Sequence, residues 1–73
     1  MLSEVLYIGD RLRQLRKQSL MTQEELAERS GVAVSTIIRI ERNQVEPHGS
    51  TIRKLAEALE VEPQELVRRA DDA

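Results

Sequence analysis

The feature that most constrains the fold of this chain is the segment TQEELAERSGVAVSTIIRIER, which predicts two short helices joined by a tight turn. Thr22 and Glu25 have the spacing of a capping box, in which the threonine hydroxyl accepts one unpaired backbone N–H and the glutamate carboxylate accepts another. A helix is therefore expected to begin directly after the threonine. Gly31 can adopt the left-handed conformation that a tight turn requires, and a second helix is expected to begin near Val34.

The second of these helices has two faces of different chemistry. At about 100° per residue, the side expected to face the core carries Thr36, Ile37 and Ile40. The opposite side carries two aliphatic side chains, a hydroxyl and two guanidinium groups, on Val34, Ser35, Ile38, Arg39 and Arg42. A solvated helix face rarely contains Val and Ile, so we expect this face to contact a partner. The open alternative is that Val34 and Ile38 are isolated exposed apolar residues without a role.

A short helix, a turn of a few residues with a glycine, and another short helix match the helix-turn-helix unit, which places its second helix in the DNA major groove. In that position Arg39 can donate two parallel hydrogen bonds to O6 and N7 of guanine. Ser35 can bond to several base edges or to a phosphate, and Val34 can contact a thymine methyl group. The sequence therefore predicts base contacts at these three residues.

Further segments make the chain resemble the phage-repressor-like helix-turn-helix domains, the Cro/cI or XRE family. The resemblance covers about residues 8–68, with IGDRLRQLRKQSLMTQEELAERSGV as its first half and STIIRIERNQ plus STIRKLAEALEVEPQEL as its second. It implies an all-α fold, a compact five-helix lambda-repressor-like DNA-binding domain with the helix-turn-helix at helices 2 and 3. Residues 1–7 are then an N-terminal extension, and residues 69–73 are a polar C-terminal tail.

The resemblance also implies a set of site residues. It assigns base contacts to Val34, Ser35 and Arg39. It assigns phosphate contacts to Arg16, Gln23, Thr36, Asn43, Gln44, His48 and Ser50. It further implies an ion pair between Arg16 on the first helix and Glu41 at the end of the third, which would hold Arg16 beside a phosphate. Two alternatives stay open: Arg16 and Glu41 are solvated and unpaired, or His48 is an exposed loop residue without a role.

Three residues depart from the family's pattern. Ala33 stands where Ser or Thr usually caps the second helix of the helix-turn-helix, called the reading helix here. That helix therefore lacks a side-chain acceptor typically worth about 1 kcal/mol. Val34 stands where a polar residue is common, which shifts recognition toward methyl contacts. Leu20 stands where glycine often follows the first helix. We therefore expect the turn at residues 18–21 to form in another way.

The net charge of the chain argues against a nucleic-acid partner, whereas the distribution of charge favours one. The chain has 73 residues and a net charge of −2, and nucleic-acid binders usually carry a basic surface. Residues 11–17 contain four positive charges and no negative ones, and residues 57–73 contain six acidic and two basic residues. We expect a modest, strongly salt-dependent affinity for DNA, with the first helix contacting phosphates. The alternative is that residues 11–17 form an ordinary solvated helix face.

The length of the chain allows one domain with a small aliphatic core. The residues expected in this core are Ile8, Leu12, Leu15, Leu26, Ile37, Ile40, Ile52, Leu55, Ala56, Leu59, Val61 and Leu66. A second copy would bury more apolar surface, and a two-fold dimer would read two half-sites about one helical turn apart. We therefore expect a homodimer on a palindromic operator. The candidate contact residues are Leu2, Val5, Leu6, Tyr7, Leu66 and Val67.

Little in the sequence indicates catalysis, a cofactor or a metal site. His48 is the only histidine, there is no cysteine, and no Gly-rich loop has phosphate-binding spacing. No apolar run is long enough for a signal peptide or a membrane span, so a cytoplasmic transcriptional regulator is expected. The competing hypothesis is a protein-interaction module of the same fold, an antitoxin or anti-repressor, in which Val34 and Ile38 contact a heterologous protein.

Overall fold

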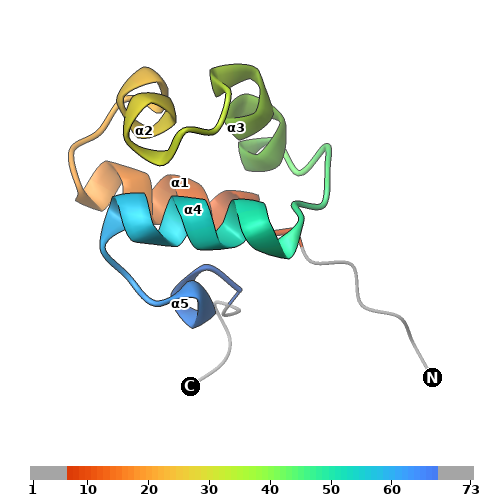
Figure 1. Ribbon diagram of the computed structural model, residues 1–73. Coiled ribbons are helices and arrows are strands. Elements are labelled where there is room, and N and C mark those ends of the chain that lie inside the picture. Colours follow the sequence, from red (N-terminus) through yellow and green to blue (C-terminus); the bar gives the residue numbers. More distant parts are fainter. Residues whose placement is uncertain (1–6, 68–73) are drawn as a thin grey trace.

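The chain folds into a small bundle of helices in a computed structural model that describes residues 7–67. The helices are α1 (Gly9–Gln18), α2 (Gln23–Ser30), α3 (Val34–Glu41), α4 (Gly49–Leu59) and α5 (Pro63–Val67). In Figure 1, α2 and α3 lie on one side of α1 and α4, and α5 lies on the other. The expected all-α fold with five helices is confirmed, and no strand occurs within the described residues. Apart from Tyr7, the predicted N-terminal extension lies outside these residues, as does the predicted C-terminal tail.

The α2–turn–α3 unit forms as its local sequence predicts. The N–H of Glu25 donates to Thr22 Oγ1 at 3.0 Å, and the N–H of Thr22 donates to Glu25 Oε1 at 2.8 Å, which completes the capping box. Gly31 ends α2 in the left-handed conformation with φ 76°, and its N–H donates to the carbonyl of Ala27. α3 then begins at Val34, as expected. The capping box therefore defines the start of α2, and Gly31 defines the turn that leads to α3.

An aliphatic core joins the helices. The buried apolar residues are Ile8, Leu12, Leu15, Met21, Leu26, Val32, Ile37, Ile40, Ile52, Leu55, Ala56, Leu59 and Leu66. All of the predicted core residues are among them except Val61, which is only partly buried against the core. Met21 and Val32 were missed, because both lie in turns where the helical spacing of apolar residues gives no signal.

Three helices are followed, within two residues of their ends, by a residue in the left-handed conformation that is not glycine. These residues are Leu20, Asn43 and Glu60, with φ between 57° and 59°. After α1, the N–H of Leu20 bonds to the carbonyl of Lys17 and the N–H of Met21 to that of Arg16, the pattern of a Schellman motif. The expectation that the turn at residues 18–21 forms in another way is therefore wrong: the turn has the geometry that glycine usually provides, with Leu20 in the left-handed conformation.

The starts of α4 and α5 are marked in different ways. α4 begins at Gly49, and His48 occupies its capping position without a side-chain hydrogen bond. A loop residue that adopts an extended backbone can take this position even when its side chain makes no cap. Pro63 occupies the first position of α5, where its missing N–H costs nothing.

Candidate nucleic-acid interface

The exposed side of α3 is the best candidate for a recognition surface. Ser35, Arg39 and Arg42 are exposed, while Ile37 and Ile40 are fully buried, as the helical spacing predicts. Val34 and Ile38, expected on the outer side, are half-buried, and so is Thr36, expected on the inner side. Within residues 7–67, the side chain of Arg39 has no hydrogen bond or ion pair. Its five N–H donors are therefore available to an external acceptor.

The N-terminal end of α3 carries no side-chain cap. Ala33 occupies the capping position with φ −58° and ψ 141°, and it offers only its carbonyl, which accepts the N–H groups of Thr36 and Ile37. The departure noted in the sequence therefore leaves this helix end without the acceptor that Ser or Thr would supply. Backbone N–H groups at an uncapped helix start attract anionic groups such as phosphates.

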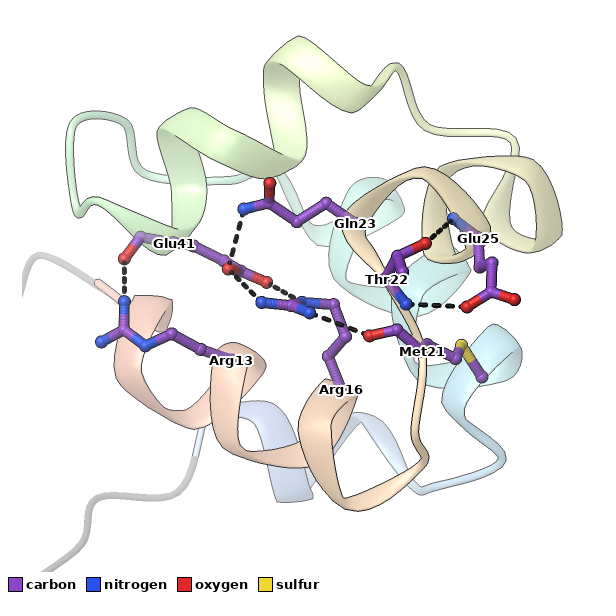
Figure 2. Close-up of polar contacts among 7 residues, drawn as sticks. All are labelled: Arg13, Arg16, Met21, Thr22, Gln23, Glu25 and Glu41. Carbon is purple, nitrogen blue, oxygen red and sulfur yellow. Dashed lines mark hydrogen bonds and ion pairs between the residues drawn. The ribbon is translucent and has the colours of Figure 1, made fainter.

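A buried ion pair connects α1 to the end of α3. Arg16 Nε donates to Glu41 Oε2 at 2.7 Å and Arg16 Nη2 donates to Glu41 Oε1 at 3.0 Å, a bidentate arrangement shown in Figure 2. The third donor, Arg16 Nη1, bonds to the carbonyl of Met21 at 2.8 Å. The two side chains are 11% and 3% exposed, so water screens this pair little. The pair predicted from the resemblance is thus present and buried.

The burial of Arg16 limits the contacts that its guanidinium group can make outside the protein. All three of its nitrogens already donate to protein oxygens, and its side chain is 11% exposed. This geometry favours a positioning role over the direct phosphate contact assigned to Arg16 from the sequence. The hydrogen bonds with Glu41 raise the pKa of Arg16 above its ordinary value, so the guanidinium stays charged. Arg16 is therefore a buried charge that joins α1 to the end of α3 through Glu41.

Gln23 shares this network. Its Nε2 donates to Glu41 Oε1 at 3.1 Å, and Figure 2 shows the amide oxygen pointing away from Glu41. The side chain is half-buried at the first position of α2. One N–H of its amide is thus used inside the protein, and the second is left for the phosphate contact predicted at this residue.

The basic run of α1 is largely neutralised within the protein. Arg11 Nη2 lies 2.7 Å from Glu65 Oε1, and Arg13 Nη2 lies 2.7 Å from Asp10 Oδ1. Together with the Arg16 pair, these contacts engage three of the four cations of residues 11–17. Lys17 is exposed and has no such contact within residues 7–67. This helix is therefore not the freely solvated face that the sequence left open, and its phosphate contacts stay a prediction.

The loop between α3 and α4 lies beside the candidate reading residue. Asn43, Gln44, His48 and Ser50, predicted as phosphate contacts, are all exposed. Asn43 Oδ1 nevertheless accepts the N–H of Gly9 at 2.9 Å. A shallow groove of about 230 Å³ lies at this junction, lined by Thr36, Arg39, Ile40, Val45, Glu46, Pro47, His48 and Thr51. The structure thus gathers Thr36, Arg39 and His48 around one concave surface.

Sequence reasoning missed several residues that shape this surface. Arg42 was placed on the outer side of α3 without a role, yet it is exposed next to the loop and has no partner within residues 7–67. Arg13 donates to the carbonyl of Glu41 at 3.1 Å, and Gly9 bonds to Asn43. The glycine in the first turn of a helix was the only signal for this contact.

The described residues give no sign of other kinds of site. Within residues 7–67, no three His, Asp or Glu side chains cluster in a way that could hold a metal ion. In the same range, no helix has the length and apolar character needed to cross a membrane.

Known proteins resemble this chain over most of its length. A family model described as helix-turn-helix matches residues 12–66. The HTH-type transcriptional regulator SinR of Bacillus licheniformis is 38% identical over 66 residues, covering 89% of this chain and 60% of SinR. The chain spans about half the length of the curated relatives it matches.

Solved structures show the same fold. The restriction-modification controller protein C.AhdI from Aeromonas hydrophila is 42% identical with a TM-score of 0.80, over 85% of this chain and 94% of C.AhdI. The P22 c2 repressor, solved in complex with a synthetic operator, is 30% identical with a TM-score of 0.76, over 90% of this chain and 97% of that chain.

Proposed function

Because the chain belongs to the helix-turn-helix family of the Cro/cI (XRE) type, we propose that it is a sequence-specific double-stranded DNA-binding transcriptional regulator. The relatives that carry names are transcriptional regulators or repressors, and the P22 c2 repressor was solved with an operator. The observation that carries the proposal is the exposed side of α3, where Arg39 has no partner within residues 7–67. A buried ion pair behind the helix holds this side outward.

In the proposed complex, α3 lies in the major groove. Arg39 donates two hydrogen bonds to a guanine, Ser35 bonds to a neighbouring base edge, and Val34 contacts a thymine methyl group. Arg39 lies four residues, about one helical turn, after Ser35 on the same side of the helix, so both can reach base edges in one groove. Val34 is half-buried, which limits it to van der Waals contact.

Phosphate contacts in this proposal come from both ends of the reading unit. They involve Gln23, Thr36, Gln44, His48 and Ser50, and Arg42 is added because its side chain is exposed and has no ion pair within residues 7–67. The contact predicted at Asn43 is not carried over, because its Oδ1 accepts the N–H of Gly9. Arg16 is removed from the direct contacts and becomes a positioning residue. A homodimer on a palindromic operator completes the proposal, since a single reading helix covers only a few base pairs. No catalysis, cofactor or metal is involved.

The experiment that tests this proposal is selection of bound sequences from a random duplex pool at about physiological salt, where non-specific contacts are weakened. A two-fold symmetric motif with half-sites about ten base pairs apart is expected. An enriched pool without a motif, or no enrichment, would contradict the proposal and favour a protein partner for Val34 and Ile38.

Substitution of Arg39 tests the assigned reading residue on the selected motif. Arg39→Ala is expected to lower affinity for the motif by about 1–3 kcal/mol and to relax one base position, because a bidentate contact to guanine is lost. Titration of wild type and variant against motif and random duplexes gives the measurement. Equal losses on both duplexes would show that Arg39 contacts the backbone and not a base.

A further inference from the structure

We propose that Asn43 is a positioning residue of the reading helix, whose side chain caps α1 and thereby fixes the C-terminal end of α3. The inference rests on the proposed function, because it assigns a role in base recognition. It differs from the phosphate contact that the resemblance gives to this residue. Four residues form the interhelix clasp that carries the inference: Gly9, Arg13, Glu41 and Asn43.

The first half of the clasp is a helix cap supplied from a distant part of the chain. The N–H of Gly9, the first residue of α1, donates to Asn43 Oδ1 at 2.9 Å across 34 residues of sequence. Ile8 occupies the capping position of α1 and has no side chain that accepts a hydrogen bond. Asn43 therefore does for α1 what Ser, Thr or Asp usually does from the preceding residue.

Gly9 makes this bond possible because it permits a close approach. A Cβ atom at Gly9 would lie 2.5 Å from the carbonyl oxygen of Ile40, 2.5 Å from Asn43 Oδ1 and 2.7 Å from the carbonyl oxygen of Glu41. Real Cβ atoms essentially never come so near to backbone atoms. The first turn of α1 thus sits directly against the last carbonyl groups of α3, in a contact that any larger residue would displace.

In the second half of the clasp, a side chain of α1 donates a hydrogen bond to the backbone at the end of α3. Arg13 Nη1 donates to the carbonyl of Glu41 at 3.1 Å, while Arg13 Nη2 is held by Asp10 at 2.7 Å. The carbonyl of Glu41 is one of the acceptors that a helix end leaves unpaired. Arg13 of α1 therefore pairs with an unpaired carbonyl at the end of α3, and Asn43 pairs with an unpaired N–H at the start of α1.

The backbone of Asn43 completes the end of the reading helix. Its φ of 57° turns the chain, so that its own N–H bonds to the carbonyl of Ile40 and the N–H of Gln44 bonds to that of Arg39, each at 2.9 Å. Arg39 lies about one helical turn before Asn43. A shift at the clasp therefore changes the angle at which Arg39 meets a base, and a bidentate contact depends strongly on angle.

Two substitutions at one position separate a cap from a phosphate contact. Asn43→Asp keeps the Oδ acceptor for Gly9 and replaces the amide donor by a negative charge, which weakens binding to every DNA sequence alike. Asn43→Gly removes the side chain and accepts a φ of 57° without strain. Gln44→Ala is the matched control, because Gln44 is exposed beside Asn43 and has no side-chain hydrogen bond within residues 7–67. Because Gln44 is a proposed phosphate contact, its loss should lower the affinity for both duplexes alike and leave their ratio unchanged.

The first measurement needs no DNA. Hydrogen exchange at the Gly9 amide is expected to be about tenfold faster or more in Asn43→Gly, and close to wild type in Asn43→Asp and Gln44→Ala. Unchanged exchange in Asn43→Gly would overturn the clasp itself. The second measurement is the ratio of affinities for the selected motif and a random duplex. We expect this ratio to fall about fivefold or more in Asn43→Gly and to be unchanged in Asn43→Asp and Gln44→Ala.

The outcomes distinguish failure of this inference from failure of the proposed function. A loss of affinity in Asn43→Gly that is equal on both duplexes, with an unchanged ratio, would make Asn43 a phosphate contact and overturn its positioning role. A wild-type protein that prefers no sequence would overturn the proposed function and the role in base recognition together. The exchange rate of Gly9 would then still report on the cap.

Discussion

Arg16 and Glu41 show how much depends on a single pair of side chains. The side chains of Arg16 and Glu41 are 11% and 3% exposed. Burying such charges costs free energy unless their donors and acceptors have hydrogen-bond partners. Here they do, because Met21 and Gln23 supply the remaining partners. The pKa of Arg16 is raised in the folded state by its hydrogen bonds with Glu41, so the stability that the guanidinium charge contributes is lost only as the pH rises through that raised pKa. Arg16 therefore stays charged in the folded protein at neutral pH.

Breaking this pair from one side should destabilise the fold strongly. Arg16→Met leaves the carboxylate of Glu41 buried without its cation, so the free energy of unfolding is expected to fall by about 3–5 kcal/mol. Urea unfolding monitored by circular dichroism gives the measurement. Arg11→Met is the control, because its pair with Glu65 is 24% and 37% exposed and is expected to contribute about 1 kcal/mol or less.

The double variant Arg16→Met/Glu41→Met completes this prediction. Replacing both charges by apolar side chains removes the unpaired carboxylate and should recover most of the lost stability. If Arg16 only positions α3, the double variant should bind DNA with the salt dependence of wild type. A salt slope reduced by about one unit would instead place Arg16 on a phosphate and contradict its positioning role.

The residues of the clasp mark the limit of what the sequence predicts. Ile37 and Arg39 were placed on the correct sides of α3, since helical spacing is a local property. The bond between Gly9 and Asn43 joins residues 34 apart, and nothing in either neighbourhood specifies the other. The resemblance placed Arg16 beside Glu41, but burial of the pair follows from how α1 meets α3. The base contacts at Val34, Ser35 and Arg39 stay predictions.

At the scale of elements, helix boundaries with local chemical signals were predicted well. The capping box at Thr22 and the left-handed Gly31 bound α2 as expected. The start of α4 has no such side-chain signal, because His48 takes the capping position through its backbone alone. The turn after α1 has no local sequence signal either, because leucine rarely adopts the left-handed conformation that Leu20 has there.

Leu20 offers a test of the energy stored at a helix end. Its φ is 59° and its side chain is 91% exposed, so leucine adopts the left-handed region, which costs about 1–2 kcal/mol, with almost no burial in return. Leu20→Gly should relieve this cost, less about 0.5–1 kcal/mol for the greater freedom of glycine in the unfolded chain. The melting temperature is expected to rise by about 4 °C.

The neighbouring position supplies the control. Ser19 is exposed and has a φ of −87°, which suits any residue, so Ser19→Gly gains nothing in the folded state and should lower stability by about 0.5–1 kcal/mol. The melting temperatures of both variants, measured by thermal unfolding, test whether Leu20 is strained. A loss in Leu20→Gly equal to that in Ser19→Gly would mean that the leucine is not strained in this turn.

For the molecule as a whole, the distribution of charge differs from the one read off the sequence. Three cations of α1 bond to acidic groups, so the basic run contributes little outward field. Within residues 7–67, the cations without an ion pair are Lys17, Arg29, Arg39, Arg42, Arg53 and Lys54. Linear sequence could not reveal this, because pairing such as that of Arg11 with Glu65 depends on packing of α1 against α5. The positive surface left for DNA therefore includes the end of α3.

Two of these cations test how the molecule lies on DNA. Arg42 ends α3, whereas Arg53 lies about 200° around α4 from Thr51, which lines the groove beside Arg39. Both are exposed, and Arg42→Gln and Arg53→Gln change the net charge equally. If the α3 side contacts DNA, Arg42→Gln should weaken binding to all sequences and reduce the slope of log affinity against log salt by about 0.9. Arg53→Gln should change neither. Equal losses would mean that overall charge, and not the α3 surface, determines binding.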